Sequence, residues 1–155
     1  MPTIYDFSLT EMNGQPINLS DYKDKVLLIV NTASKCGLAP QLETIEQLYQ
    51  DYKDKGFAVI GLPSNQFHQE LENDQDTSDY CQRHYGVTFP MTKKVKLNGD
   101  EADPLINYLK EQSGKGAIKW NFTKFLIGKY GQLIHRYAPM TSPKKMEAEI
   151  VQALK

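Results

Sequence analysis

Two cysteines, Cys36 and Cys81, are the side chains of this sequence best suited to redox chemistry. The thiolate is the nucleophilic form of cysteine, but a free thiol with a pKa of about 8.5 is mostly protonated at neutral pH. Cys36 follows a short apolar run and precedes a helical segment, where unpaired N–H groups and the helix dipole favour an anion. Cys36 is therefore a candidate reactive thiol, and the alternative is a small buried hydrophobic residue.

The elements that position Cys36 are a buried strand before it and a helix after it. Val26–Val30 is wholly apolar, which is typical of a central strand covered on both faces. Pro40 opens a helix that Gly56 ends, and its apolar residues recur at helical spacing: Leu42, Ile45, Leu48, Tyr49 and Tyr52. Phe57–Leu62 is a second buried run, so this part of the chain predicts a parallel strand–helix–strand unit with a right-handed crossover.

Antiparallel hairpins are expected near both ends of the chain. Asp6–Leu9 and Pro16–Leu19 flank Asn13-Gly14, a pair of residues that tolerates the positive φ of a tight turn. Thr123–Ile127 and Gln132–Tyr137 are strand-like runs separated by a turn that glycines bound on both sides. The sheet is therefore expected to mix parallel and antiparallel strands.

Three more helices complete the predicted pattern. Ser78–Tyr85 forms a short helix that carries Cys81, Pro104 opens a helix with Leu105, Ile106 and Leu109 on its apolar face, and a closing helix runs from about Pro143 to Leu154. A strand–helix–strand half followed by a strand–strand–helix half, with a cysteine before the first major helix, is the arrangement of the thioredoxin-like fold. We therefore predict an α/β protein with a central mixed β-sheet flanked by helices and an N-terminal β-hairpin. Residues 1–155 are expected to form a single domain.

The composition is that of a soluble globular protein, with 40% hydrophobic and 24% charged residues. The 18 basic and 19 acidic residues leave a net charge of −1, so no basic surface for nucleic acid is expected. The longest apolar run is too short to span a membrane, and Met1–Asp6 lacks the features of a signal peptide. We expect no membrane insertion and a cytoplasmic location, where a permanent disulfide would be unusual.

Three segments closely resemble the sequence motifs of glutathione peroxidases. They are Asn31–Gln41, which contains Cys36, then Leu62–Glu70 and Lys119–Leu126, and the likeness extends over essentially the whole chain. The chain is similar to the non-selenium, cysteine-type members of that family. The resemblance implies a thioredoxin-like fold and an antioxidant enzyme of the oxidative stress response. Such an enzyme reduces hydrogen peroxide and organic hydroperoxides at Cys36 without a cofactor or metal.

The resemblance also assigns roles to residues around Cys36. In the family a glutamine, a tryptophan and an asparagine lie beside the peroxidatic residue, and they correspond here to Gln69, Trp120 and Asn121. Each side chain can donate a hydrogen bond to the thiolate and to the charge that develops on peroxide oxygen. Gln66 is the alternative to Gln69, because this loop is one residue shorter than the common family pattern.

The catalytic cycle that the resemblance implies begins with a Cys36 sulfenic acid. Cys81 lies in a segment similar to the one that holds the resolving cysteine of two-cysteine members, so a redox-active Cys36–Cys81 disulfide is expected. Thioredoxin is the expected reductant of that disulfide. Glutathione, acting in a one-cysteine mechanism, is the alternative. The short segment before Trp120 resembles that of members that are monomers or weak dimers.

Other functions fit the sequence less well. A peroxiredoxin would carry proline and threonine or serine where this chain has Ile29 and Ala33, and a dithiol oxidoreductase would carry cysteine at Ala39. The three histidines, His68, His84 and His135, show no metal-ligand spacing. Two competing hypotheses remain, a peroxide sensor that passes oxidation to a partner protein, and a structural binding module with an unreactive Cys36.

Overall fold

The computed structural model describes residues 3–33, 37–64 and 85–155. Its centre is a four-stranded sheet in the order β4-β3-β5-β6. The strands are β3 (Val26–Thr32), β4 (Phe57–Pro63), β5 (Lys124–Ile127) and β6 (Leu133–Tyr137). β3 pairs in parallel with β4 and antiparallel with β5, so the predicted mixed sheet is confirmed.

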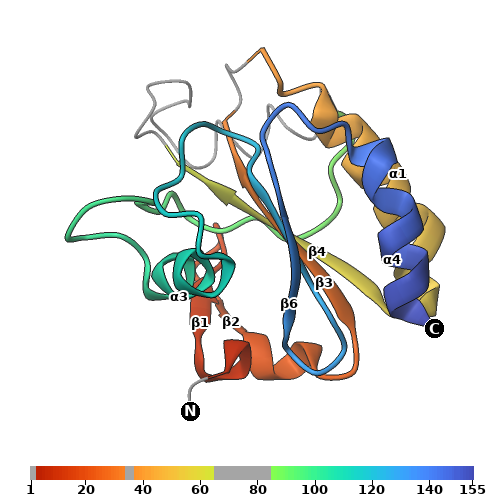
Figure 1. Cartoon of the computed structure of the whole chain (residues 1–155), viewed down its shortest axis with the longest axis horizontal. Coiled ribbons are helices and arrows are strands. Elements are labelled where there is room, and N and C mark those ends of the chain that lie inside the picture. Colours follow the sequence, from red (N-terminus) through yellow and green to blue (C-terminus); the bar gives the residue numbers. More distant parts are fainter. Residues whose placement is uncertain (1–2, 34–36, 65–84) are drawn as a thin grey trace.

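Helices cover both faces of this sheet (Figure 1). They are α1 (Gln41–Tyr52), α3 (Pro104–Ser113) and α4 (Glu147–Leu154). α1 connects β3 to β4, and a 3₁₀ turn at Lys53–Lys55 follows it before Gly56, which has a φ of 97°. The predicted closing helix begins as a 3₁₀ turn, Pro143–Met146, and continues as α4. The predicted helix at Ser78–Tyr85 lies almost wholly outside the described residues.

The predicted N-terminal hairpin is confirmed as a two-stranded ribbon between two short 3₁₀ turns, Ile4–Asp6 and Leu19–Tyr22. Its strands β1 (Ser8–Thr10) and β2 (Pro16–Asn18) pair antiparallel. In the turn, Gly14 has a φ of 89°, and the side chain of Asn13 accepts a hydrogen bond from the backbone N–H of Gln15. This local chemistry explains why a short sequence signal was enough to predict the hairpin.

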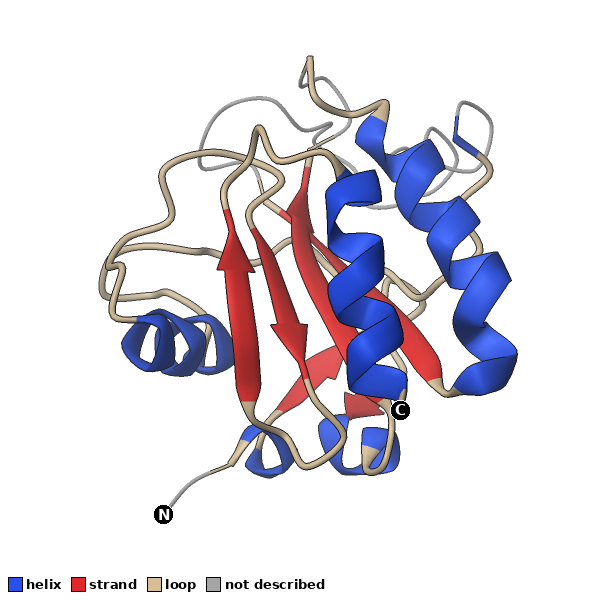
Figure 2. Cartoon of the chain, turned by 45° about the vertical axis from the view of Figure 1, so that its right-hand side comes forward, coloured by secondary structure: helices blue, strands red, loops and turns tan. Residues whose placement is uncertain are grey.

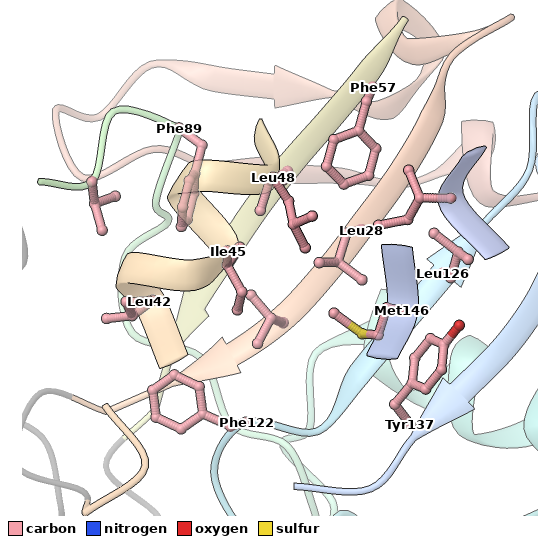
Figure 3. Packing of buried hydrophobic residues seen from close by; sticks show 14 of the residues in the cluster. Leu28, Leu42, Ile45, Leu48, Phe57, Phe89, Phe122, Leu126, Tyr137 and Met146 are labelled. Atoms are coloured by element: carbon pink, nitrogen blue, oxygen red, sulfur yellow. The ribbon is translucent and has the colours of Figure 1, made fainter. Parts of the chain in front are cut away.

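Alternate residues of β3 enter two separate hydrophobic clusters. Val26, Leu28 and Val30 pack with residues of α1 and α4, as Figure 3 shows for Leu28. Leu27 and Ile29 pack with the apolar face of α3 and with the N-terminal ribbon. Figure 2 shows α1 and α4 together on one side of the sheet and α3 apart from them. Neither face of Val26–Val30 meets solvent, which explains the unbroken apolar run.

The connections at one end of the sheet define the region of interest. β3 ends at Thr32 and α1 begins at Gln41, so the chain passes from strand to helix at the carboxyl end of β3. The segments that enter β5 and leave β6 lie at the same end (Figure 1). In open α/β sheets this is the end at which functional residues gather. In the part of the chain that the structure describes, no helix is both long and apolar enough to cross a membrane.

Candidate active site

A four-residue turn, Trp120–Thr123, docks against the end of β3. The backbone N–H of Phe122 donates to the carbonyl of Asn31 at 2.7 Å, and the N–H of Asn31 donates to the carbonyl of Thr123 at 3.2 Å. Asn31 lies five residues before Cys36 in the sequence. The structure therefore brings the motif segment that leads to Cys36 beside the one that contains Trp120. The third motif segment begins at Leu62, which pairs with Asn31 in the parallel ladder of β3 and β4.

Asn121 is the unusual residue of this turn. Its side chain is fully buried, and neither its amide nitrogen nor its amide oxygen has a hydrogen-bond partner among the described residues. A buried amide without partners costs free energy, and native proteins rarely retain one without a functional reason. Asn121 is therefore available to a group that its described neighbours do not provide.

The other two side chains of the turn have different environments. Trp120, the only tryptophan of the chain, is 38% exposed. Phe122 is fully buried in the cluster that contains Leu42 (Figure 3), and its φ of 68° is rare for a bulky residue. The packing of Phe122 thus holds a strained turn in which Trp120 and Asn121 are presented next to the end of β3.

The remaining predicted site residues lie outside the described part of the structure. These are Cys36, Gln66, Gln69 and Cys81. The choice between Gln66 and Gln69 therefore stays a prediction, as do the roles of both cysteines.

The structure does describe the residues on either side of the segment that carries Cys81, and both are hydrogen-bonded, one to β3 and the other to α1. At one end, the N–H of the buried Ser64 donates to the carbonyl of Thr32, the last residue of β3. At the other end, Glu46 of α1 accepts hydrogen bonds at 2.7 Å from both the N–H and the hydroxyl of Thr88. Both ends are therefore attached to the two elements that flank residues 34–36.

A buried lysine connects β5 to the start of α1. The side chain of Lys124 is fully buried, and its ammonium donates to the carbonyls of Ala138, Pro139 and Thr141 at 3.4, 2.9 and 2.7 Å. The Gln41 side chain, in the first turn of α1, donates to the same Pro139 carbonyl at 3.0 Å. Three backbone acceptors thus replace water around this charge and fix the segment after β6 against α1.

Titration of Lys124 gives the first testable prediction. Burial lowers the pKa of Lys124 from 10.5 to about 8, so the folded protein releases this proton at a pH where the unfolded chain still holds it. Since the unfolded state binds more protons above about pH 8, the free energy of unfolding rises with pH there. Between about pH 7.5 and 9.5, the wild type should gain about 2 kcal/mol relative to Lys124→Met. Urea unfolding across this range measures the difference.

A matched control separates this effect from general alkaline changes. Lys144 is exposed in the 3₁₀ turn before α4, so Lys144→Met should show the pH dependence of the wild type. If Lys124→Met and the wild type changed in parallel with pH, the assignment of this titration to Lys124 would be wrong.

The described residues do not gather a metal site, since no group of three or more histidine, cysteine, aspartate or glutamate side chains could hold an ion. His135 instead lies 2.8 Å from Glu149 of α4 and stacks on Tyr137. Burial is the main cause of a raised pKa for Tyr137, which also donates a hydrogen bond to Glu149. These contacts attach α4 to β6.

Two buried polar residues of this region cannot be recognised from sequence patterns. Asn31 and Lys124 both lie within motif segments, but neither stands out by residue type alone. Asn31 directly follows the apolar run of a buried strand. This position was the one sequence feature that could have indicated a role for its polar side chain. Lys124 begins a strand whose other residues are apolar, and its burial depends on carbonyls that lie 14 to 17 residues further along the chain.

Comparison with known proteins adds independent information. The sequence profile of the glutathione peroxidase family matches residues 4–110. A glutathione peroxidase of Lactococcus lactis is 51% identical over 154 residues, which are 97% of this chain and 98% of the relative. A glutathione peroxidase-like peroxiredoxin of Saccharomyces cerevisiae is 45% identical over 160 residues, with 100% and 98% of the two chains covered.

Solved structures agree with these relatives. The crystal structure of Trgpx in apo form superposes with a TM-score of 0.82 at 38% identity, covering 99% of this chain and 95% of that one. A thioredoxin-family protein of Chlorobium tepidum TLS superposes with a TM-score of 0.70 at 19% identity, over 96% and 93% of the two chains. The second likeness concerns the fold alone and confirms the predicted thioredoxin-like architecture. With a family profile over residues 4–110 and full-length relatives above 40% identity, the chain belongs to the glutathione peroxidase family.

Proposed function

We propose that this protein is a thiol peroxidase that reduces hydrogen peroxide and organic hydroperoxides at Cys36. The Cys36 thiolate attacks one peroxide oxygen, the O–O bond breaks, and the other oxygen leaves as water or an alcohol after it takes up a proton. The sulfur is oxidised to a sulfenic acid. The Cys81 thiol then attacks this sulfur and releases water, and a dithiol reductant returns two electrons to the Cys36–Cys81 disulfide.

The buried amide of Asn121 is the observation that carries this proposal. An amide N–H that has no partner among the described residues can donate to a thiolate and to the oxygen on which negative charge develops during O–O cleavage. The turn that holds Asn121 is hydrogen-bonded to Asn31, on the strand that leads to Cys36. Trp120 supplies an indole N–H in the same turn, and Gln69, or Gln66 in its place, supplies the third donor.

The attachment of the Cys81 segment supports a two-cysteine cycle. Its ends are held by Thr32 and by Glu46, on the elements that flank residues 34–36. Cys81 lies seven residues before Thr88, and an extended chain of that length reaches up to about 24 Å. We infer that this length of chain lets Cys81 approach Cys36.

Thioredoxin is the reductant that best fits a disulfide intermediate, because a dithiol donor can resolve it without a second thiol molecule. The name of the yeast relative, a glutathione peroxidase-like peroxiredoxin, agrees with this assignment. We place the protein in the cytoplasm, as a single domain over residues 1–155 that works as a monomer or weak dimer. Its role there is antioxidant.

The reductant assignment gives the second prediction. With excess peroxide, thioredoxin and thioredoxin reductase, the wild type should turn over continuously, whereas Cys81→Ser should lose at least about 100-fold in steady-state rate. The variant lacks the thiol that forms the disulfide, but its first oxidation at Cys36 should proceed normally. NADPH consumption measures turnover, and peroxide loss in a single turnover measures the first step.

The same assay with glutathione as sole reductant tests the alternative mechanism. Glutathione-supported turnover that survives in Cys81→Ser would replace the two-cysteine cycle with a one-cysteine cycle. Oxidation that stops after one equivalent in the wild type, with a mixed disulfide to one partner protein, would instead indicate a peroxide sensor.

A further inference from the structure

The side-chain amide of Asn31 is bonded to both ends of the turn that presents Trp120 and Asn121. Its Oδ1 accepts a hydrogen bond from the backbone N–H of Thr123 at 3.0 Å, and its Nδ2 lies 3.5 Å from the carbonyl of Trp120, to which it donates. Asn31 is 3% exposed. One buried amide therefore bonds to the last N–H and the first carbonyl of a four-residue turn, and the hydroxyl of Thr123 donates to the same carbonyl at 3.2 Å.

This contact extends the sheet beyond its regular pairing. The antiparallel ladder between β3 and β5 ends at the pair formed by Val30 and Lys124. Beyond it, the backbone of Asn31 still bonds to Phe122 and Thr123. Its side chain adds one accepted and one donated hydrogen bond, as the N–H and carbonyl of a further strand residue would. Asn31 thus joins the end of β3 to the turn through four polar groups.

The turn needs such a support because its own geometry is unfavourable. Phe122 has a φ of 68°, a conformation that a bulky residue rarely adopts, and Asn121 is buried without described partners. Both features would relax if the turn were free to move. The bonds from Asn31 oppose that relaxation from the strand on which the chain continues toward Cys36.

We propose that Asn31 is a positioning residue for peroxide reduction, whose side-chain amide holds Trp120 and Asn121 in the geometry that Cys36 requires. This inference rests on the proposed peroxidase function and goes beyond it, because Asn31 acts through the turn and not on the peroxide. A displacement of catalytic groups by about 1 Å can lower a rate by about 100-fold. Asn31→Ala should therefore lose about 100-fold in the single-turnover rate with hydrogen peroxide.

Trp120 provides a readout that does not depend on activity. It is the only tryptophan, so fluorescence excited at a wavelength that the nine tyrosines do not absorb reports on this turn alone. In folded Asn31→Ala, acrylamide should quench this fluorescence more strongly than in the wild type. Asn31→Asp keeps an oxygen that can accept from the Thr123 N–H but places a second, buried oxygen against the Trp120 carbonyl, so its quenching should also exceed that of the wild type. Quenching in folded Asn31→Ala equal to that of the wild type would overturn the proposal.

Asn98 supplies a matched control, because its side chain makes the same kind of contact elsewhere. Its Nδ2 donates to the carbonyl of Ile118 at 2.7 Å and its Oδ1 accepts from the Ile118 N–H at 2.9 Å. Asn98→Ala removes an amide clamp on Ile118, two residues before the turn begins, and leaves the bonds from Asn31 in place, so its peroxide rate should stay within about two-fold of the wild type. If Asn98→Ala lost as much rate as Asn31→Ala, the effect would be general loosening.

A double-mutant cycle decides whether Asn31 acts through Asn121. If it does, Asn31→Ala should cost much less in an Asn121→Leu background than in the wild type, because the group that it positions is already gone. Full additivity of the two losses would show that Asn31 does not act through Asn121 and would overturn that part of the proposal. Failure of the peroxidase function itself would be seen separately, as a wild type that does not consume peroxide.

Discussion

Cys36→Ser should abolish peroxide reduction, with a loss of roughly 10⁴-fold or more in the single-turnover rate. Serine has nearly the shape of cysteine, but its hydroxyl is far more weakly acidic than a thiol and its oxygen is a much poorer nucleophile toward a peroxide bond. The reduced wild type should consume one equivalent of hydrogen peroxide without any added reductant. Stopped-flow measurement of peroxide loss gives both the rate and the stoichiometry.

Chemical trapping of the sulfenic acid shows whether Cys36 is the residue that is oxidised. Trapping with a sulfenic-acid reagent should add one label at Cys36 in Cys81→Ser, where no disulfide can form, and none in Cys36→Ser. The chain has only these two cysteines, so mass spectrometry can assign the label without ambiguity. Peroxide consumption that persists at the wild-type rate in Cys36→Ser would remove the basis of the proposed function.

The sequence predicted the sheet well because its signals are local. The unbroken apolar run of β3 follows from its two buried faces, and the turn at Asn13-Gly14 follows from the backbone freedom of two residues. Several strand boundaries differ from the prediction by one or two residues, and one of these differences has a cause that is not local in the sequence. The predicted strand at Thr123 begins at Lys124, because the N–H of Thr123 is bonded to the Asn31 side chain.

The site could be predicted only in part. Motif resemblance identified Trp120 and Asn121, and the structure places their turn beside the strand that leads to Cys36. The supports of that turn depend on contacts between residues 92 positions apart, and such a register cannot be read from spacing. Lys124 is a similar case, because a lysine in a strand is ordinarily exposed and only the folded carbonyls around it permit burial.

Asn121→Leu should change stability and activity in opposite directions. Leucine is similar in shape to asparagine and has no polar atoms, so it removes a buried amide that the described residues leave without partners. Such a replacement is expected to leave the free energy of unfolding unchanged or to raise it, by up to about 2 kcal/mol. The single-turnover rate with peroxide should fall by about 10² to 10³-fold, the usual effect of losing one preorganised donor.

The opposition between the two effects is what distinguishes a catalytic amide from a structural one. A structural asparagine has partners in the fold, so its replacement by leucine would lower the free energy of unfolding and leave the peroxide rate nearly unchanged. Asn107→Leu, the same substitution at an exposed position of α3, controls for the added apolar surface and should alter neither quantity. Urea unfolding and stopped-flow oxidation on the same preparations provide both numbers. Lower stability with a normal rate would assign Asn121 to the fold, and the donors to the developing charge would then have to be sought in Trp120 and the glutamine.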